Sequence, residues 1–238
     1  MAEKYILQEY YIRYLRDIRK VSDTTIRQYQ NALNNISNFL VKENEISQTI
    51  YEVLDIDELE GLRQFLYQNV EFMAQNQRGH RMYSAGLNNY LDFANGEYFA
   101  KSKFDVAMLD ISMPVSQKDV RNQTIWKRSG IIKKQIMKQA DYLCEIDAAH
   151  KTFIAESTKQ QYMEGHHAIP IRLQESFAYS LDIYANVICL CPVCHRLLHY
   201  GVREQKKVLL SRIYKDRSER LAKSGIKISK SDFIELLQ

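Results

Sequence analysis

The sequence predicts an α+β protein in which an all-helical N-terminal part precedes a mixed part built on a two-stranded hairpin. Two observations lead to this fold class. Apolar residues recur at three- and four-residue steps, the helical period, through the first hundred residues. Further along, Met163–Ile169 and Val187–Cys191 have the composition of strands, and Pro192 follows at a position where a helix can begin. The chain has 238 residues, which is enough for two small domains.

The N-terminal part is expected to contain a series of amphipathic helices. The first spans Glu3–Lys20, and the second begins after Ser22, a residue type that caps helix N-termini. The third spans about Asp57–Met73, and a fourth begins near Ser84. The apolar residues expected to be buried by the third helix are Leu59, Leu62, Leu66 and Val70.

A segment with little periodicity, residues 105–125, is predicted to be a linker between residues 1–104 and 126–238. After it, a basic helix is expected from Ser129 to about Tyr142, an amphipathic helix from Arg203 to Arg220, and a short one from Ser231. The sequence has no apolar run long enough to cross a membrane and no cleavable leader, so a cytoplasmic location is expected.

The positive charge is concentrated in the second half of the chain. Residues 1–100 contain 10 Lys and Arg against 14 Asp and Glu, whereas residues 101–238 contain 23 against 15. A basic half favours a polyanionic partner such as nucleic acid, although a solvated basic surface has the same composition. The basic residues assigned to DNA contact on this interpretation are Lys127, Arg128, Lys133, Lys134 and Arg196.

Cysteine and histidine gather in the same basic half. All four cysteines lie between Cys144 and Cys194, and five of the six histidines lie between His150 and His199. In a cytosolic chain this combination indicates metal binding rather than disulfides. Histidines on a strand and a helix can hold a divalent ion that activates a phosphate, and a further histidine can take a proton from water. His80, in the helical half, is assigned no role.

These residues also form a recognisable series. His166-His167-x-x-Pro170, then Asn186, then Cys191-x-x-Cys194-His195 and His199, resembles the HNH (ββα-metal) endonucleases, and most of all their restriction-type, McrA-like branch. The resemblance extends over about Ser129–Leu221. It implies an HNH nuclease domain over residues 126–238, with a structural zinc site and flanking helices. It also implies single-metal hydrolysis of DNA that leaves 5′-phosphate and 3′-hydroxyl ends.

The resemblance assigns a role to each polar residue of the series. His166 and His195 would bind the catalytic metal, and His199 would be a third ligand or a phosphate contact. His167 would be the general base, while Asn186 would brace the loop and help to orient that base. Mg²⁺ is the expected ion, and ligation by histidine also suits Mn²⁺, Ni²⁺ or Zn²⁺.

Many members of the family hold a second, structural zinc ion with two Cys-x-x-Cys pairs. Here Cys191 and Cys194 form one pair, but Asp147 occupies the position of the second cysteine of the other. The expected Cys₃His ligand set is therefore Cys144, His150, Cys191 and Cys194, with Asp147 as the alternative to His150. Without zinc, Cys144 would be a buried thiol. Cys189 is expected to be a core residue.

The N-terminal half is similar to a different family. Its pattern Ser22-x-x-Thr25-x-x-x-Tyr29, with a later Tyr83-x₆-Tyr90, resembles the helical core-binding domain of tyrosine recombinases over residues 5–98. The recombinase catalytic domain has no room in this chain, so recombination is not expected. The resemblance implies a helical DNA-recognition or dimerisation domain over residues 1–104. A bundle that only supports the nuclease is the alternative.

The first functional hypothesis is therefore a site-specific, restriction-type endonuclease that acts on double-stranded DNA. One active site cuts one strand, so a homodimer is expected to cut both. Two alternatives share some of the same residues. One is a zinc-stabilised DNA- or RNA-binding module without catalysis, and the other is a non-specific HNH nuclease or toxin.

Overall fold

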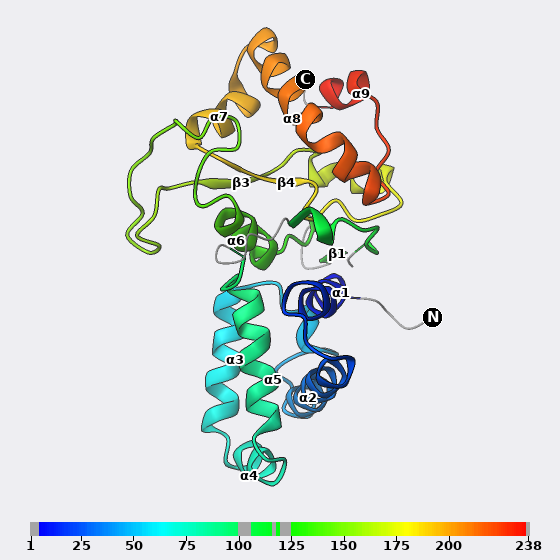
Figure 1. Cartoon of the computed structure of the whole chain (residues 1–238), viewed down its shortest axis with the longest axis vertical. Helices are drawn as coiled ribbons and strands as arrows, with labels where there is room; N and C mark the ends of the chain where they lie inside the picture. Colours follow the sequence, from blue (N-terminus) through cyan, green and yellow to red (C-terminus); the bar gives the residue numbers. More distant parts are fainter. Residues whose placement is uncertain (1–4, 100–105, 116–117, 120–124, 237–238) are drawn as a thin grey trace. The chain divides into compact units, whose positions relative to one another are not determined.

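The computed structural model describes residues 5–99, 106–115, 118–119 and 125–236, and it consists of two compact units, Met1–Ser102 and Lys103–Gln238 (Figure 1). Parts of the expected linker over 105–125, and the boundary expected at residue 104, lie outside the described residues. Among the described helices, none combines the length and the apolar character needed to cross a membrane.

The first unit is helical and has an aromatic core. Its elements are α1 (Ile6–Arg13), the π-helix η1 (Tyr14–Ile18), α2 (Asp23–Lys42), η2 (Ile50–Glu52), α3 (Ile56–Gln68), α4 (Val70–Arg78) and α5 (Met82–Ala94). The predicted cap of α2 is confirmed, because Ser22 Oγ accepts a hydrogen bond from the Thr25 backbone at 3.2 Å. Helices α2 and α5 approach closely at Gly86, where a Cβ atom would lie 2.8 Å from that of Ala32. Fully buried rings fill the core, among them Tyr10, Tyr11, Tyr14, Tyr90 and Phe93.

The single helix predicted over Asp57–Met73 is wrong in one respect. The helix is interrupted at Asn69, whose extended backbone ends α3. The Asn69 side chain caps α4 by accepting the Phe72 backbone N–H at 3.0 Å. The break turns the next residues away from the buried seam of α3. Val70 is consequently 84% exposed instead of buried.

The second unit combines helices with two small antiparallel sheets. Its elements are η3 (Val106–Leu109), β1 (Lys118–Asp119), β2 (Ile125–Trp126), α6 (Gly130–Gln139), β3 (Glu164–His167), η4 (Ile171–Ser176), β4 (Val187–Leu190), α7 (Pro192–Tyr200), α8 (Arg203–Lys223) and α9 (Lys230–Glu235). Strands β3 and β4 form the predicted hairpin, in which Glu164 pairs with Leu190 and His167 pairs with Val187. Ser129, at which the basic helix is expected to start, caps α6 by accepting the Ile132 backbone N–H at 3.2 Å.

The β3–β4 hairpin is held from two sides. Helix α6 packs against it at Gly165, where a Cβ atom would lie only 2.5 Å from Cγ of Lys133. Helix α8 contributes the buried Arg217, which pairs with Glu145. The same Glu145 binds both backbone groups of Cys189 in β4, through its own N–H at 2.9 Å and its carboxylate at 2.7 Å. Glu145 therefore connects α8 to the hairpin.

Residues 106–115, within the segment predicted as a linker, pack into the second unit. The buried Asp110 accepts two hydrogen bonds from Arg220 of α8, at 2.5 and 3.0 Å. Val106, Leu109 and Met113 are also buried. This stretch therefore contributes to the core of the second unit.

Candidate metal centres

Three cysteines and one histidine meet at the N-terminus of α7. The potential ligand atoms of Cys144, His150, Cys191 and Cys194, here called the zinc cluster, all lie within 4.8 Å of one another. Nδ1 of His150 is 3.5 Å from the sulfur atoms of both Cys191 and Cys194. All three cysteines are buried and free of disulfides. A Cys₃His set of this kind could hold a structural metal such as zinc.

The environment of Cys144 favours the metal-binding form of its thiol. Burial by itself would raise its pKa, but hydrogen bonds from the backbone of Cys191 and Asp147 and from the His150 side chain lower the pKa of Cys144 to about 7. The thiolate is the form that binds metal. Burial instead raises the pKa of Cys189, which lies within β4 and outside the zinc cluster, as expected for a core thiol.

The structure places His150, and not Asp147, among the sulfur atoms. The Asp147 carboxylate lies on the opposite side of the imidazole, 4.0 Å from Nε2 of His150, and it accepts the Ala149 backbone N–H. The two side chains that the sequence left as alternatives therefore occupy different positions.

We expect His150→Ala to weaken zinc binding at least about 100-fold, because it removes a nitrogen that faces the three sulfur atoms. Asp147→Asn should weaken zinc binding less than about 10-fold. A residue that hydrogen-bonds to a metal ligand contributes about 10- to 100-fold to metal affinity, and the Asp147 carboxylate lies 4.0 Å from His150, which is longer than a hydrogen bond. Competition with a chromogenic chelator measures both affinities. The reverse ranking would identify the carboxylate as the fourth ligand.

A second group of potential ligands lies between β3 and α7. His166 on β3 meets His195 and His199, which are one turn apart on α7, and their ligand atoms lie within 4.8 Å of one another. The ring centroids of this histidine cluster are 4.9 to 5.2 Å apart. The hairpin and the helix thus bring together the three residues that the sequence assigned to the catalytic ion.

His166 has the properties of an available ligand. Burial, with additional repulsion from His195 and His199, lowers its pKa to about 3, so its ring is neutral at physiological pH. Its Nε2 atom is buried and has no hydrogen-bond partner among the described residues. A buried polar atom without a partner is energetically costly, and a metal ion would remove that cost. The cluster therefore fits a divalent ion, and its nitrogen donors suit a transition metal better than Mg²⁺.

Two carboxylates that the sequence did not single out bind the histidines of the site. Glu164 bonds Nδ1 of His195, which leaves Nε2 of that ring facing His199 at 3.3 Å. Oδ1 of the buried Asp182 lies 2.8 Å from Nε2 of His167, and its Oδ2 accepts the Ser129 backbone N–H at 2.6 Å. Strand alternation could have identified Glu164, because it shares a face of β3 with His166. No local pattern identifies Asp182.

Asn186 acts on the loop between the strands. Its fully buried side chain donates hydrogen bonds to the carbonyl groups of Ile169 and Leu181, and it accepts one from the Ile169 backbone, at 2.7 to 2.9 Å. The hydrogen bond of the His167 ring is to Asp182. Asn186 therefore fixes the segment that carries Asp182.

The basic residues assigned to DNA contact lie in two places. Lys127, Arg128 and Lys133 are exposed at the start of α6, where Lys134 is partly buried. Arg196 is exposed on α7, between the two histidines of that helix, and its charge contributes to a lowered pKa of His199 after the effect of burial. Arg196 therefore lies beside the histidine cluster.

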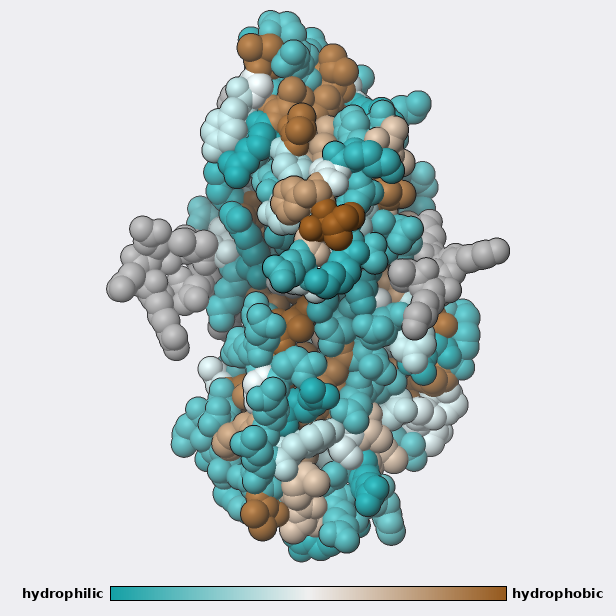
Figure 2. All heavy atoms as spheres, turned by 90° about the vertical axis from the view of Figure 1, so that its left-hand side faces the viewer, coloured by the Kyte–Doolittle hydropathy of each residue, from teal (hydrophilic) through white to brown (hydrophobic). Residues whose placement is uncertain are grey.

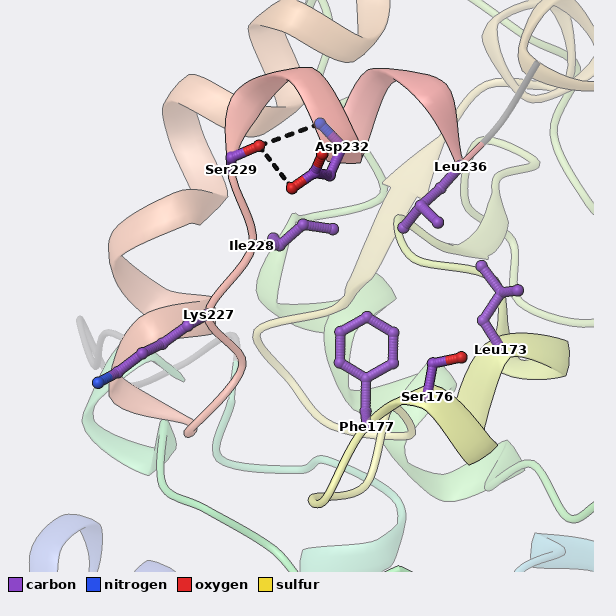
Figure 3. Close-up of a pocket in the computed structure, with 8 residues that line it drawn as sticks. All are labelled: Leu173, Ser176, Phe177, Lys227, Ile228, Ser229, Asp232 and Leu236. Atoms are coloured by element: carbon purple, nitrogen blue, oxygen red, sulfur yellow. Dashed lines mark hydrogen bonds between the residues drawn. The ribbon is translucent and has the colours of Figure 1, made fainter.

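A cavity of about 480 Å³ opens elsewhere on the second unit, between η4 and the segment that leads into α9 (Figure 3). Phe177, Ile228 and Leu236 form its apolar part, and Lys227 and Asp232 line its edge. Ser229 caps α9 there by accepting the Asp232 backbone N–H at 3.1 Å. None of its lining residues is a histidine or cysteine, so this cavity is separate from both metal centres.

Comparison with known proteins relates part of the chain to restriction enzymes. A stretch of 94 residues, 40% of the chain, is 31% identical to the type IV methyl-directed restriction enzyme EcoKMcrA of Escherichia coli (strain K12). The chain covers 31% of that enzyme's length. No family model matches the chain.

Proposed function

We propose that this protein is a metal-dependent DNA endonuclease of the HNH type with a restriction role. One observation carries the proposal: the histidine cluster lies beside His167, whose ring is held by a buried carboxylate. The similarity to a restriction enzyme supports the same class of activity. Site specificity, the single-metal mechanism, and the 5′-phosphate and 3′-hydroxyl ends are parts of the proposal.

Each residue of the site then has a definite task. A divalent ion held by the histidine cluster would supply Lewis acidity toward a phosphodiester of the substrate. His167 takes a proton from the attacking water through Nδ1, because Nε2 is engaged by Asp182. Glu164 fixes the ring of His195, and Asn186 fixes the loop that carries Asp182.

The remaining assignments complete the proposal. The zinc cluster stabilises the second unit, which functions as the nuclease domain, and the exposed basic residues around α6 contact DNA phosphates. The helical first unit recognises DNA or dimerises, and two copies cut both strands in the cytoplasm. The nitrogen ligands lead us to expect higher activity with Mn²⁺ or Ni²⁺ than with Mg²⁺.

The proposal is tested by incubating the full chain with unmodified and cytosine-methylated plasmid, in Mg²⁺, Mn²⁺, Ni²⁺ or EDTA. Discrete metal-dependent fragments are expected from the wild type and from His80→Ala, which changes an exposed histidine of the first unit. They should be absent from His195→Ala. Protein that binds DNA but yields no product with any metal would instead be a zinc-stabilised binding module, and degradation without discrete fragments would indicate a non-specific nuclease.

We expect Asp182→Asn to lower the single-turnover rate of cleavage about 100-fold while leaving the affinity for DNA unchanged. The substitution keeps the shape of the side chain but removes the charge that holds His167, and a general base contributes about 10²- to 10⁴-fold in total. Single-turnover cleavage measures the rate, and a gel shift measures binding. Asp147→Asn, at a carboxylate remote from His167, is the matched control. An unchanged rate, or equal losses of rate and binding, would contradict the role of Asp182.

A further inference from the structure

An ordered arm precedes the histidine hairpin. Residues 151–162, here called the aromatic arm, form the yellow-green loop that projects from the second unit in Figure 1. Ile154 and Gln161 form an antiparallel bridge, and the Tyr162 backbone donates to the carbonyl of Phe153 at 2.8 Å. Thr152 Oγ1 donates to the Tyr162 carbonyl at 2.9 Å. The arm is therefore a small hairpin with defined geometry.

The arm presents an aromatic stack to solvent. The rings of Phe153 and Tyr162 lie 4.8 Å apart and are inclined by only 15°, which is parallel stacking. Phe153 is 64% exposed and the adjacent Ile154 is 60% exposed. Figure 2 views the side toward which the arm projects, and small apolar patches lie there among hydrophilic side chains. One face of the stack is thus open to a further flat ring.

The stack is connected directly to the histidine cluster. The Tyr162 hydroxyl donates to Glu164 at 3.3 Å, and the other oxygen of Glu164 bonds His195. Next to the cluster on α7, the ring of Tyr200 lies 5.9 Å from that of His199 and is 78% exposed. A phosphodiester bound at the cluster would therefore lie near exposed aromatic rings of both the arm and α7.

Cationic side chains lie on the arm and beside Tyr200. Lys151 and Lys159 are exposed on the arm. The guanidinium of Arg196 lies 6.0 Å from the Tyr200 ring, and its charge acts on Tyr162 to oppose the rise in pKa that the Glu164 carboxylate causes. Aromatic rings interleaved with positive charge are the combination that proteins use to bind unpaired nucleotides.

We propose that the aromatic arm stacks an unpaired or unstacked DNA base next to the phosphodiester held at the histidine cluster. The inference rests on the proposed nuclease function and specifies a feature of the preferred substrate. A second protein copy is a poor fit, because a stable interface buries about 800 Å² per partner and an aromatic side chain buries only about 150–250 Å². A base can stack on the open ring face, and the phosphates of its strand can pair with the nearby cationic side chains.

The test measures binding of three fluorescent DNA probes to the full chain. The probes are a 30-base single strand, its fully paired duplex, and the same duplex with a central two-nucleotide bulge. Binding is measured without divalent metal, in the His167→Ala background, so that no cleavage occurs. Phe153→Ala, Phe153→Leu and Phe153→Trp are compared with Val208→Ala, which shortens an exposed apolar side chain on α8.

We expect tighter binding of the bulged and single-stranded probes than of the paired duplex, and Phe153→Ala should weaken binding of those two about 5- to 150-fold. Binding of the paired duplex should change less than about 2-fold. Phe153→Trp should retain the preference, and Phe153→Leu should lose most of it, since leucine keeps apolar area but has no π face. Because Phe153 is exposed, all variants should unfold at nearly the temperature of the wild type.

The inference would be overturned if Phe153→Ala bound each of the three probes as tightly as its parent does. A change in oligomeric state, measured by sedimentation, without a change in DNA binding would also overturn it. Plasmid cleavage by Phe153→Ala in the otherwise wild-type chain keeps this result separate from the proposed function. If the wild type cleaves and the probe preference is absent, only the stacking role fails. If the wild type does not cleave, the nuclease proposal fails whatever the probes show.

Discussion

His167→Ala should abolish DNA cleavage and leave DNA binding nearly intact. His167 is neither a member of the histidine cluster nor one of the exposed basic residues, and its ring is held by Asp182. Loss of a general base lowers the rate about 10²- to 10⁴-fold. Single-turnover cleavage of plasmid and a gel shift in EDTA measure the two properties. Added imidazole should restore part of the rate, because a free base can occupy the space that the side chain leaves.

Measuring the bound metal distinguishes a general-base role of His167 from a role as a metal ligand. We expect His167→Ala to bind as much Mn²⁺ as the wild type, whereas His166→Ala should lose that ion together with its activity. The two histidines are adjacent in sequence, which makes them a matched pair. Loss of Mn²⁺ from His167→Ala, or loss of DNA binding in parallel with cleavage, would exclude it as the base.

Cys194→Ala should unfold or strongly destabilise the second unit. Its sulfur belongs to the zinc cluster, which joins the loop around Cys144 to the start of α7. Zinc contributes about 10–16 kcal/mol to small zinc-stabilised folds at pH 7. Loss of even a quarter of that should lower the midpoint of thermal unfolding of a unit this size by about 10 °C. Prolonged chelation of the wild type should have the same effect.

Cys189→Ala is the control for this experiment. Cys189 is a buried thiol only two residues from the zinc cluster, but it does not belong to it, so this variant should keep one zinc ion per chain. Trp126, the only tryptophan, lies in the second unit, and its fluorescence reports on that unit. Equal destabilisation of both variants with unchanged zinc content would show that Cys194 is only a core residue.

The local features of the fold could be predicted from the sequence. The cap at Ser22, the strands of the hairpin, and the convergence of His166 with two histidines on α7 follow from side-chain chemistry and helical or strand period. These properties depend on neighbours within a few residues. The resemblance to the HNH endonucleases added the two sets of expected ligands, and the structure brings the members of each set together.

Other features depend on tertiary closure. The break at Asn69 is invisible to apolar spacing, because Val70 continues the pattern of the preceding helix while its side chain is exposed. The contact between Asp182 and His167 depends on the path of the loop, which the hydrogen bonds of Asn186 to Ile169 and Leu181 hold in place. Contacts between residues on either side of an irregular loop follow no repeating sequence pattern, so the Asp182–His167 contact could not be predicted from the sequence.

Both candidate metal centres depend on one short helix. Helix α7 carries Cys194 in its first turn and His195 and His199 after it, so its rotation sets the direction of the potential ligands in both clusters. Each added residue turns an α-helix by about 100°. An insertion or deletion between Cys194 and His195 would therefore rotate Cys194 relative to the two histidines. If one cluster kept its geometry, the ligands of the other would point in the wrong direction. Length variation among descendants of this chain should avoid α7 and accumulate at the tip of the aromatic arm, where added residues rotate neither centre.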